Sequence, residues 1–450
     1  MKKIISFVLA TVMLLGMFSI GTFAEAPLTL DMKAVEGASV RIGGVAGIRF
    51  QTMINKAELD ALVEEKGASN VEIGTLITPT QYVQGAGAFT MAALDAYVAN
   101  KGYENAAYVK VKATYANPFD TETVDGTEYY VYAGSLENIL DANVMLEFSG
   151  IGYVKVGDEV VYAEYNEFNS SRTVGYVAYR AYLANDENLG TDGKSLIDKF
   201  ANKFLSAKLG ADAPEISTIR YFETFDDMAN GEYELATKLL GWSAEEGRYT
   251  VKDNAVSRSD IRAKYNDGKL VFNAPVTEGT FNKKDSASMA DFSGFLTIPG
   301  LNQAMYADGD KYLVMEFDLK INSTDNNDFG MGVAYCDTDN HFARAIPILK
   351  SNYQILVYMN DVNTMGYALA KPLGADFSAD TVKIKFVWSL DSTGNGEVYV
   401  NDTLVGSNQG YWGSGSALAG RNYKLGLYFL GSGEYEVDNL LVYSYNSQAN

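Results

Sequence analysis

From Ile219 onward the chain is a succession of short runs in which apolar and polar residues alternate, separated by turns rich in Gly, Asn and Asp. Alternation of period two places neighbouring side chains on opposite faces of a strand. A series of such strands predicts two packed antiparallel sheets. The runs that carry this prediction are 268–273, 311–321, 330–335, 353–358, 382–388, 396–400, 423–428 and 433–444.

The preceding residues mix helix-like and strand-like segments without strict alternation, which predicts an α+β domain over residues 25–212. Helical periodicity and capping residues predict helices that start at Asn55 and Thr90, with Gly67 and Gly102 as stops, and two more over 171–184 and 192–209. The clearest boundary follows Gly210, so residues 213–218 are predicted to be a linker to a second domain over 219–450.

The first 24 residues have the features of a secretory signal peptide. Lys2 and Lys3 give a positive start, an apolar stretch follows, and Ala24 offers a small residue for cleavage before Glu25. An uncleaved membrane anchor is the alternative, because the apolar stretch is close to the length that a span needs. We expect a secreted or extracellular protein, associated with a cell surface, with no membrane insertion after cleavage.

Charge and cysteine content restrict the partners and the means of stabilisation. The chain has 57 acidic and 36 basic residues and a net charge of −21, which disfavours nucleic acid and anionic lipid as partners. Cys336 is the single cysteine, so no intramolecular disulfide forms and we expect this thiol to be buried and inert. Nothing in the sequence predicts an oligomeric state.

The two ends of the second half together carry a family resemblance. Tyr221-Phe-Glu-Thr-Phe-Asp-Asp227 opens it, and Gly433-Glu-Tyr-Glu-Val-Asp-Asn-Leu-Leu-Val-Tyr-Ser444 closes it. An aromatic and acidic opening strand with a closing Val-Asp-Asn strand resembles concanavalin A/laminin-G-like jelly rolls and the carbohydrate-binding modules built on the same sandwich. The resemblance implies a multidomain chain, in which an α+β N-terminal domain precedes an all-β jelly-roll sandwich.

The first half resembles an uncharacterised extracellular domain of secreted Firmicutes proteins. The residues that carry this resemblance are Gly47-Ile-Arg-Phe50, Gly74-Thr-Leu-Ile-Thr-Pro79, Gly152-Tyr-Val154 and Ser170-Ser-Arg-Thr-Val-Gly-Tyr-Val-Ala178. That domain has no assigned activity, so the resemblance implies no chemistry for this half.

Catalytic patterns are sparse. The single histidine, His341, cannot build a multi-histidine metal site, and its setting after Asp337 predicts a turn. Jelly-roll endoglucanases carry three acids on one strand, and Glu316-Phe-Asp318 supplies two of them, while Lys320 and Ile321 occupy the possible third positions. We therefore expect Glu316 and Asp318 to face outward, and we predict a protein that is not an enzyme and has no catalytic residues.

In many sandwich modules acidic side chains from the first and last strands hold one calcium ion. The resemblance therefore implies a structural calcium site with Glu223, Asp226, Asp227 and Asp438 as ligands. Calcium takes about six to eight oxygen ligands, so both ends of the domain would have to contribute. The alternative is that these four are solvated acids at strand ends.

Aromatic side chains that stack on sugar rings are the expected means of glycan binding. The candidates are Tyr411 and Trp412 in a Gly- and Ser-rich segment, and Tyr353 and Tyr358 on a strand. Trp388 alternates with apolar residues and is predicted to be core. The sequence thus predicts a secreted, non-catalytic protein that binds polysaccharide or cell-surface glycan. A structural or protein-adhesion protein and a glycan-active enzyme with an unfamiliar carboxylate pair are the alternatives.

Overall fold

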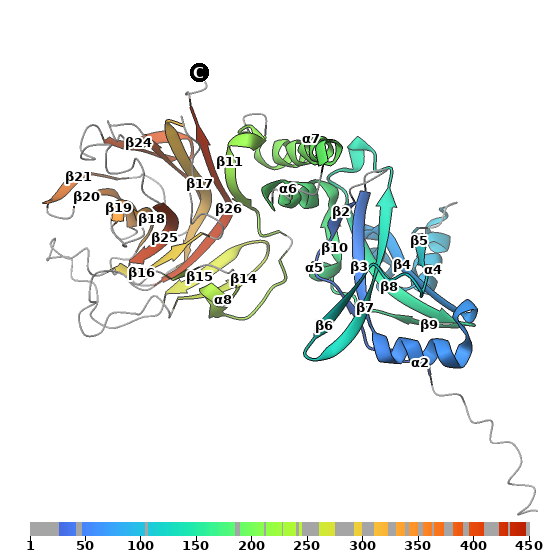
Figure 1. The fold of residues 1–450 in the computed structure, drawn as a ribbon. Helices are drawn as coiled ribbons and strands as arrows, with labels where there is room; N and C mark the ends of the chain where they lie inside the picture. The colour runs from blue at the N-terminus through green and yellow to red at the C-terminus, as the bar shows by residue number, and fades with distance from the viewer. Residues whose placement is uncertain are drawn as a thin grey trace, which may run out of the picture. The chain divides into compact units, whose positions relative to one another are not determined.

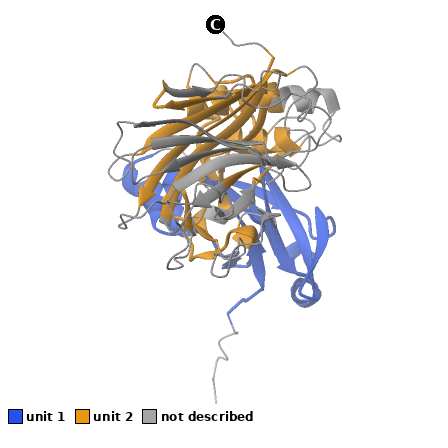
Figure 2. Cartoon of the chain, turned by 90° about the vertical axis from the view of Figure 1, so that its left-hand side faces the viewer, with its two compact units in different colours: residues 1–36, 49–136, 149–165 blue, residues 37–48, 137–148, 166–450 orange. Residues whose placement is uncertain are grey.

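A computed structural model describes most of the chain. The described residues are 27–41, 47–103, 107–184, 190–210, 213–226, 228–239, 243–244, 261–274, 292–298, 310–322, 330–337, 342–349, 354–361, 364–372, 381–389, 396–408, 423–430 and 433–446. The chain divides into two compact units (Figure 2). Unit 1 comprises residues 1–36, 49–136 and 149–165, and unit 2 comprises 37–48, 137–148 and 166–450. Within the described residues no helix is long and apolar enough to cross a membrane.

Unit 1 combines antiparallel strands with short helices. One sheet has the order β1-β3-β7-β6, and a second contains β8, β4 and β5, with β9 beside β8. The strands are β1 Met32–Ala34, β3 Gly47–Asn55, β4 Val71–Pro79, β5 Val109–Ala113, β6 Asp120–Val124, β7 Thr127–Glu137, β8 Glu147–Val156 and β9 Glu159–Tyr162. The helices are α2 Lys56–Lys66, α3 Thr80–Ala86 and α4 Met91–Lys101, with a 3₁₀ turn η1 at Ala68–Asn70.

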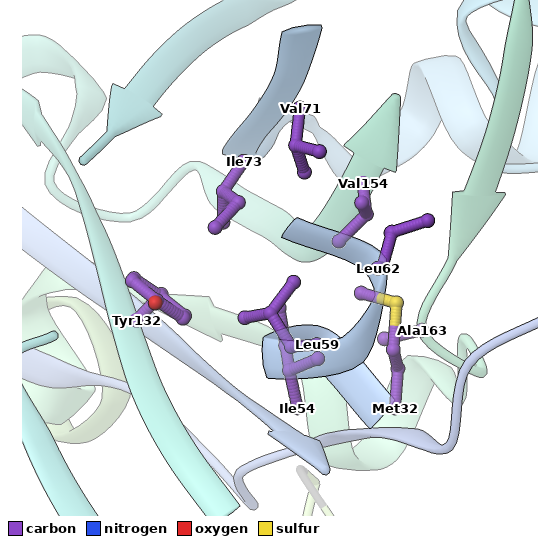
Figure 3. Close-up of a cluster of buried hydrophobic side chains, with 9 residues drawn as sticks. All are labelled: Met32, Ile54, Leu59, Leu62, Val71, Ile73, Tyr132, Val154 and Ala163. Carbon is purple, nitrogen blue, oxygen red and sulfur yellow. The ribbon is translucent and has the colours of Figure 1, made fainter. Parts of the chain in front are cut away.

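The core of unit 1 forms where α2 covers the strands. Leu59 and Leu62 on one side of α2 are buried against side chains from β1, β3, β4, β7 and β8 (Figure 3). Each buried aliphatic side chain of this kind contributes about 1.5–3 kcal/mol relative to exposure. The full cluster is Met32, Ile54, Leu59, Leu62, Val71, Ile73, Tyr132, Val154 and Ala163.

The predicted helix starts are confirmed, with one change in their chemistry. Asn55 caps α2 by accepting from the backbone N–H groups of Ala57 and Glu58. Glu58, three residues after Asn55 and thus at the position of a capping-box partner, instead accepts from the backbone N–H of Asp31 at 2.7 Å. Gly102 ends α4 in the left-handed conformation, at a φ of 69°.

Unit 2 contains a helical pair and two sheets. Its other elements before the sheets are β2 Ser39–Arg41, η2 Asp141–Asn143, α5 Glu167–Ser170, β10 Ser171–Thr173, α6 Val174–Ala184, α7 Gly190–Leu209 and η4 Ile216–Thr218. The predicted helices over 171–184 and 192–209 therefore correspond to α6 and α7. Phe204 of α7 stacks on Tyr179 of α6 at a centroid distance of 5.7 Å, which ties the two helices together.

The first sheet, which we call the β17 sheet, has the order β12-β14-β15-β26-β17-β22-β23-β24, with β11 beside β26. The second, the β18 sheet, has the order β13-β16-β25-β18-β19-β20-β21. The strands of the β17 sheet are β11 Ile219–Glu223, β12 Glu234–Leu235, β14 Arg262–Tyr265, β15 Leu270–Ala274, β17 Tyr312–Asn322, β22 Val382–Ser389, β23 Gly396–Val400, β24 Thr403–Asn408 and β26 Gly433–Tyr445, with helix α8 at Ala236–Leu239. Those of the β18 sheet are β13 Ser243–Ala244, β16 Phe292–Thr297, β18 Gly330–Asp337, β19 Phe342–Leu349, β20 Gln354–Asp361, β21 Thr364–Pro372 and β25 Tyr423–Leu430.

The two sheets form a β-sandwich (Figure 1). Alternate residues of the central strands are buried on one face, as the period-two pattern predicts. On β17 these are Leu313, Met315, Phe317, Leu319 and Ile321, each no more than 1% exposed. Trp388 on β22 is fully buried and stacks on Phe386 at 5.8 Å, which confirms its assignment to the core.

The first and last strands of the sandwich pair with each other, as the jelly-roll resemblance requires. Glu223 on β11 lies opposite Leu440 on β26, and Phe222 lies opposite Leu441. Strand β26 also pairs with β15 through its first residues and with β17 along its length. The long closing strand therefore organises the β17 sheet.

The compact units do not divide at the predicted linker. Unit 2 includes α6 and α7, because Phe222 of β11 contacts both Tyr179 and Phe204. Compactness tells which segments pack together, not which fold alone, so a separate α+β domain over 25–212 with a linker at 213–218 stays a prediction.

Candidate functional site

The outward face of the β17 sheet gathers tyrosines and charged side chains. The buried residues of β17 alternate with Tyr312, Val314 and Glu316, which the pleat places on the opposite face. Strand register extends this face across β26, β22 and β23, since Glu316 lies opposite Leu441 and Lys385. We call the following set the tyrosine face: Tyr312, Glu316, Lys383, Lys385, Glu397, Tyr399, Tyr443 and Tyr445.

Three of these tyrosines form a continuous stack. Tyr312 and Tyr445 are direct cross-strand partners, with ring centroids 5.0 Å apart and planes tilted by 23°. Tyr443, two residues before Tyr445 on the same face of β26, stacks on it at 6.0 Å. All three rings are partly exposed. Val314, which lies opposite Tyr443, is fully buried although it is on the outward face.

Charged groups hold the rings in place. Tyr399 donates to Glu397 at 2.6 Å, and Lys385 lies over the Tyr399 ring at 5.4 Å from its centroid. Burial, together with neighbouring polar groups, raises the pKa of both Tyr399 and Tyr445 to about 12. These phenols therefore stay neutral across the physiological range.

Glu316 is the most enclosed charged group of the tyrosine face, with 9% of the residue exposed. Its carboxylate lies 3.4 Å from Lys383 and accepts a hydrogen bond from Tyr443. Burial opposes the charge on Lys383, but Glu316 and Asp402 outweigh it and raise the Lys383 pKa. The prediction that Glu316 faces away from the core is confirmed, because Met315 and Phe317 on either side are the buried residues.

A tight turn positions Lys383 and the end of β23. Asn401 and Asp402 both have positive φ angles, of 48° and 61°, which is the geometry of a two-residue hairpin turn between β23 and β24. The Asn401 side chain accepts from the backbone N–H of Lys383 at 2.9 Å. Asp402 thus occupies a left-handed position at which Gly is common.

The four predicted calcium ligands have different surroundings. Glu223 is buried, and its carboxylate accepts from Arg180 at 3.2 Å and from the backbone N–H groups of Thr224 and Phe225. Burial raises the Glu223 pKa in spite of these donors. Both carboxylate oxygens of Glu223 thus have hydrogen-bond donors, and its role as a calcium ligand stays a prediction.

Asp226 and Asp438 do come close enough to repel each other. The pKa of Asp438 is raised to about 6, first by burial and then by Asp226 and Asp318, while the backbone N–H of Asn439 opposes the shift. Asp226 forms an ion pair with Lys208 of α7 at 2.6 Å. Asp227 lies outside the described residues. Among the residues that are described, no three His, Cys, Asp or Glu side chains form a group that could hold a metal ion.

The predicted sugar-stacking residues are mostly outside the part of the chain that the structure describes. Tyr353, Tyr411 and Trp412 lie there, and so does His341. Tyr358 is on β20, where the register places it opposite Ala345 of β19 and Tyr367 of β21. Tyr358 therefore belongs to the β18 sheet and is not part of the tyrosine face, which lies on the β17 sheet.

The tyrosine face was missed from the sequence, although one signal was present. Tyr443 and Tyr445 are two residues apart, which predicts that they share a face of the closing strand. Their neighbours Tyr312 and Tyr399 come from distant segments. Only the pairing of β17 with β26, and of β22 with β23, brings them together.

Comparison with known proteins gives structural likeness only. No protein-family model matches the chain, and no curated protein does, so the resemblance of the first half to a Firmicutes domain is unsupported. Among solved structures, a Bacillus licheniformis β-glucanase is similar at a TM-score of 0.32 and 12% identity, over 50% of this chain and 96% of that one. An endo-1,3-β-glucanase from Streptomyces sioyaensis is similar at 0.34 and 10%, over 50% and 96%. A carbohydrate-binding module from Bacillus subtilis is similar at 0.26 and 11%, over 45% and 96%.

These comparisons correct one prediction. The expectation that the chain is not an enzyme is contradicted, because several of the similar solved structures are glucanases. The absence of a third acid after Glu316 and Asp318 excludes one strand motif only, and it does not test carboxylates that other strands contribute.

Proposed function

We propose that the C-terminal sandwich binds carbohydrate and that the tyrosine face is its binding surface. The observation that carries the proposal is the gathering of Tyr312, Tyr399, Tyr443 and Tyr445 with Glu316 and Glu397 on one sheet face. The jelly-roll resemblance of the sequence supports the same class of ligand. The pairing of β11 with β26 agrees with that resemblance.

The chemistry of the face suits a sugar ring. A pyranose has apolar C–H faces that stack on aromatic rings and hydroxyl groups that need hydrogen-bond partners around the edge. The phenol hydroxyls of Tyr312 and Tyr445 make no hydrogen bond within the described residues, so each has capacity for a ligand hydroxyl. Glu397 and Lys385 beside Tyr399 add a strong acceptor and a strong donor.

The tyrosine face also favours binding because some of its side chains are held in place before a ligand binds. Glu316 already has Lys383 and Tyr443 as partners, so its side chain is held before a ligand arrives. A pre-ordered site loses less conformational entropy on binding than a flexible one.

We further propose an exported protein that meets polysaccharide or glycan outside the cell. The support is the pattern of Lys2, Lys3, the apolar stretch and Ala24. A structural calcium ion held by Glu223, Asp226, Asp227 and Asp438 stays a prediction.

Affinity electrophoresis of the mature chain through gels that contain soluble polysaccharides tests the proposal. We expect retardation by at least one polysaccharide and its loss in the double variant Y399A/Y445A. A matched control is Tyr233→Ala, which removes a partly exposed tyrosine that hydrogen-bonds Glu434 elsewhere on the same sheet. Release of reducing ends or unsaturated products is measured on the same samples, so that any catalysis is detected. Equal retardation of wild type and double variant would overturn the proposal.

A further inference from the structure

Unit 1 has an aromatic surface of its own, formed by the first turn of helix α3 and the C-terminal part of α4. Tyr82 on α3, Tyr97 on α4 and Tyr103 just after α4 contact one another pairwise, with ring centroids 5.9, 6.1 and 6.5 Å apart. Tyr103 is 49% exposed, and the other two are partly exposed. We call these three residues the tyrosine triad.

The local backbone holds the triad together. Gly102 takes the left-handed conformation at the end of α4, and this lets the backbone N–H of Tyr103 donate to the carbonyl of Val98 at 3.1 Å. Tyr103 is thereby turned back toward the last turns of α4. Tyr82 also packs against the buried cluster that includes Leu94, which fixes the inner edge of the triad.

Gly85 provides the space that Tyr97 occupies. A Cβ atom at Gly85 would lie 2.5 Å from Cε2 and 2.8 Å from the hydroxyl oxygen of Tyr97. Gly85 lies within α3, where glycine costs about 1 kcal/mol relative to alanine. The absence of a side chain at this helical position is what allows Tyr97 to lie against α3.

We propose that the tyrosine triad is a second carbohydrate-binding site, which takes the pyranose rings of a neutral polysaccharide. None of the three hydroxyls makes a hydrogen bond within the described residues, so all three are available to a ligand. A net charge of −21 disfavours an anionic ligand. A charged neighbour of the triad is Lys101, whose ammonium lies 5.5 Å from the Tyr97 ring centroid and can donate to a ring or hydroxyl oxygen.

A neutral glycan fits this surface better than an apolar protein partner does. The exposed large apolar side chains of the described residues are Tyr103, Val109, Phe119, Leu140 and Leu404, so no large exposed aliphatic residue of α3 or α4 extends the triad. Protein interfaces of stable size need about 800 Å² per partner, whereas a sugar ring needs a few aromatic side chains. Tyrosine also offers a rigid surface that loses little side-chain entropy on binding.

The test uses the full mature chain with the tyrosine face disabled by Y399A/Y445A, so that binding by unit 1 is seen alone. In affinity gels with neutral polysaccharides this chain is expected to retain a weaker retardation. Adding Tyr103→Ala should lower the remaining affinity about five- to tenfold. Adding Phe119→Ala, which removes another exposed aromatic residue of unit 1, should leave it unchanged.

A second variant tests the geometry without removing any tyrosine. Gly85→Ala forces the Tyr97 ring to move, yet alanine favours the helix, so we expect weaker binding with an unchanged or higher melting temperature. The proposal is overturned if the Y399A/Y445A chain binds no neutral polysaccharide, or if Tyr103→Ala leaves its binding intact. Concentration-dependent self-association that Tyr103→Ala abolishes would assign the triad to contacts between copies instead. A separate outcome would contradict only the role of the tyrosine face. In that case the Y399A/Y445A chain would bind polysaccharide as well as the wild type does, and adding Tyr103→Ala would remove this binding.

Discussion

Arg180 on α6 donates to the carboxylate of Glu223 on β11 at a distance of 3.2 Å, and it does so beside the point where the first strand of the sandwich pairs with the last. Glu223 is buried, whereas half of the Arg180 side chain is exposed. The ion pair therefore joins the helical pair to the sandwich at its opening strand.

Removal of Arg180 should leave a buried carboxylate without its charged partner. We expect Arg180→Ala to lower the free energy of unfolding by about 1–3 kcal/mol, less than for a fully buried pair because Arg180 is half exposed. Burial already raises the Glu223 pKa, and loss of Arg180 raises it further. The folded variant then binds a proton more readily than the unfolded chain, so its stability relative to wild type should fall as the pH rises from 5 to 8.

Urea unfolding at several pH values measures this effect. The matched control is Glu223→Gln, in whose background Arg180→Ala should cost less and show no added pH dependence. If Arg180→Ala lowers the free energy of unfolding by the same amount at pH 5 and at pH 8 in the chain that keeps Glu223, the account is contradicted.

The helical pair should be needed for a stable sandwich. A fragment that begins at Ser217 lacks α6 and α7 and exposes Phe222, which contacts both helices, whereas a fragment that begins at Asn166 keeps them. We expect the longer fragment to be soluble, with a cooperative melting transition, and the shorter one to aggregate or melt at least 10 °C lower. Equal melting temperatures would show that the predicted boundary near residue 213 is the folding boundary after all.

Asp438 should destabilise the metal-free protein at neutral pH. Its pKa is raised to about 6 by burial and by neighbouring acids, so above pH 6 the folded chain holds a carboxylate that water would solvate better. Asp438→Asn keeps the acceptor for the Asn439 N–H and should add about 1–2 kcal/mol at pH 7.5, a gain that disappears below pH 4.

The same variant tests the predicted calcium ion. Thermal melting is measured after treatment with a chelator and again with added calcium. A calcium ion held by Asp438 would make Asp438→Asn less stable than wild type in calcium and would remove the calcium-dependent rise in melting temperature. A wild-type melting temperature that calcium does not change would argue against the ion.

Gly150 should tolerate no side chain. A Cβ atom there would lie 2.2 Å from Cγ of Phe50, which is 2% exposed and cannot move without disturbing the core. We expect Gly150→Ala to lower the free energy of unfolding by about 3 kcal/mol or more, at the upper end of overpacking costs. Gly231, whose added Cβ would meet no atom within 4 Å, provides the control, since Gly231→Ala should stay within about 0.5 kcal/mol of wild type in urea unfolding.

Periodicity in the sequence predicted most of the strands and helices for a physical reason. The alternation of buried residues on β17 and β22 depends only on residues close together in the sequence. The same holds for the helix caps at Asn55 and Thr90. The pairing of β11 with β26 followed from the resemblance and is confirmed by the register.

The functional surfaces depend on contacts that no local pattern encodes. Tyr312 and Tyr445 are far apart in sequence and meet only through strand register, and the helix α3 that carries Tyr82 was not predicted. The loop candidates Tyr411 and Trp412 lie outside the described residues, so their proposed role in sugar stacking stays a prediction. Charge counting could not reveal that Glu223 is paired with Arg180, because Arg180 lies on α6, before the predicted boundary.

Isothermal titration of the mature chain with the polysaccharide that retards it most tests the central claim most directly. If the tyrosine face binds the sugar, Y399A/Y445A should raise the dissociation constant at least tenfold. Tyr233→Ala should leave the dissociation constant within twofold of the wild-type value, and the melting temperature unchanged. A dissociation constant for Y399A/Y445A equal to that of the wild type would contradict the assignment of this sheet face as the principal binding site.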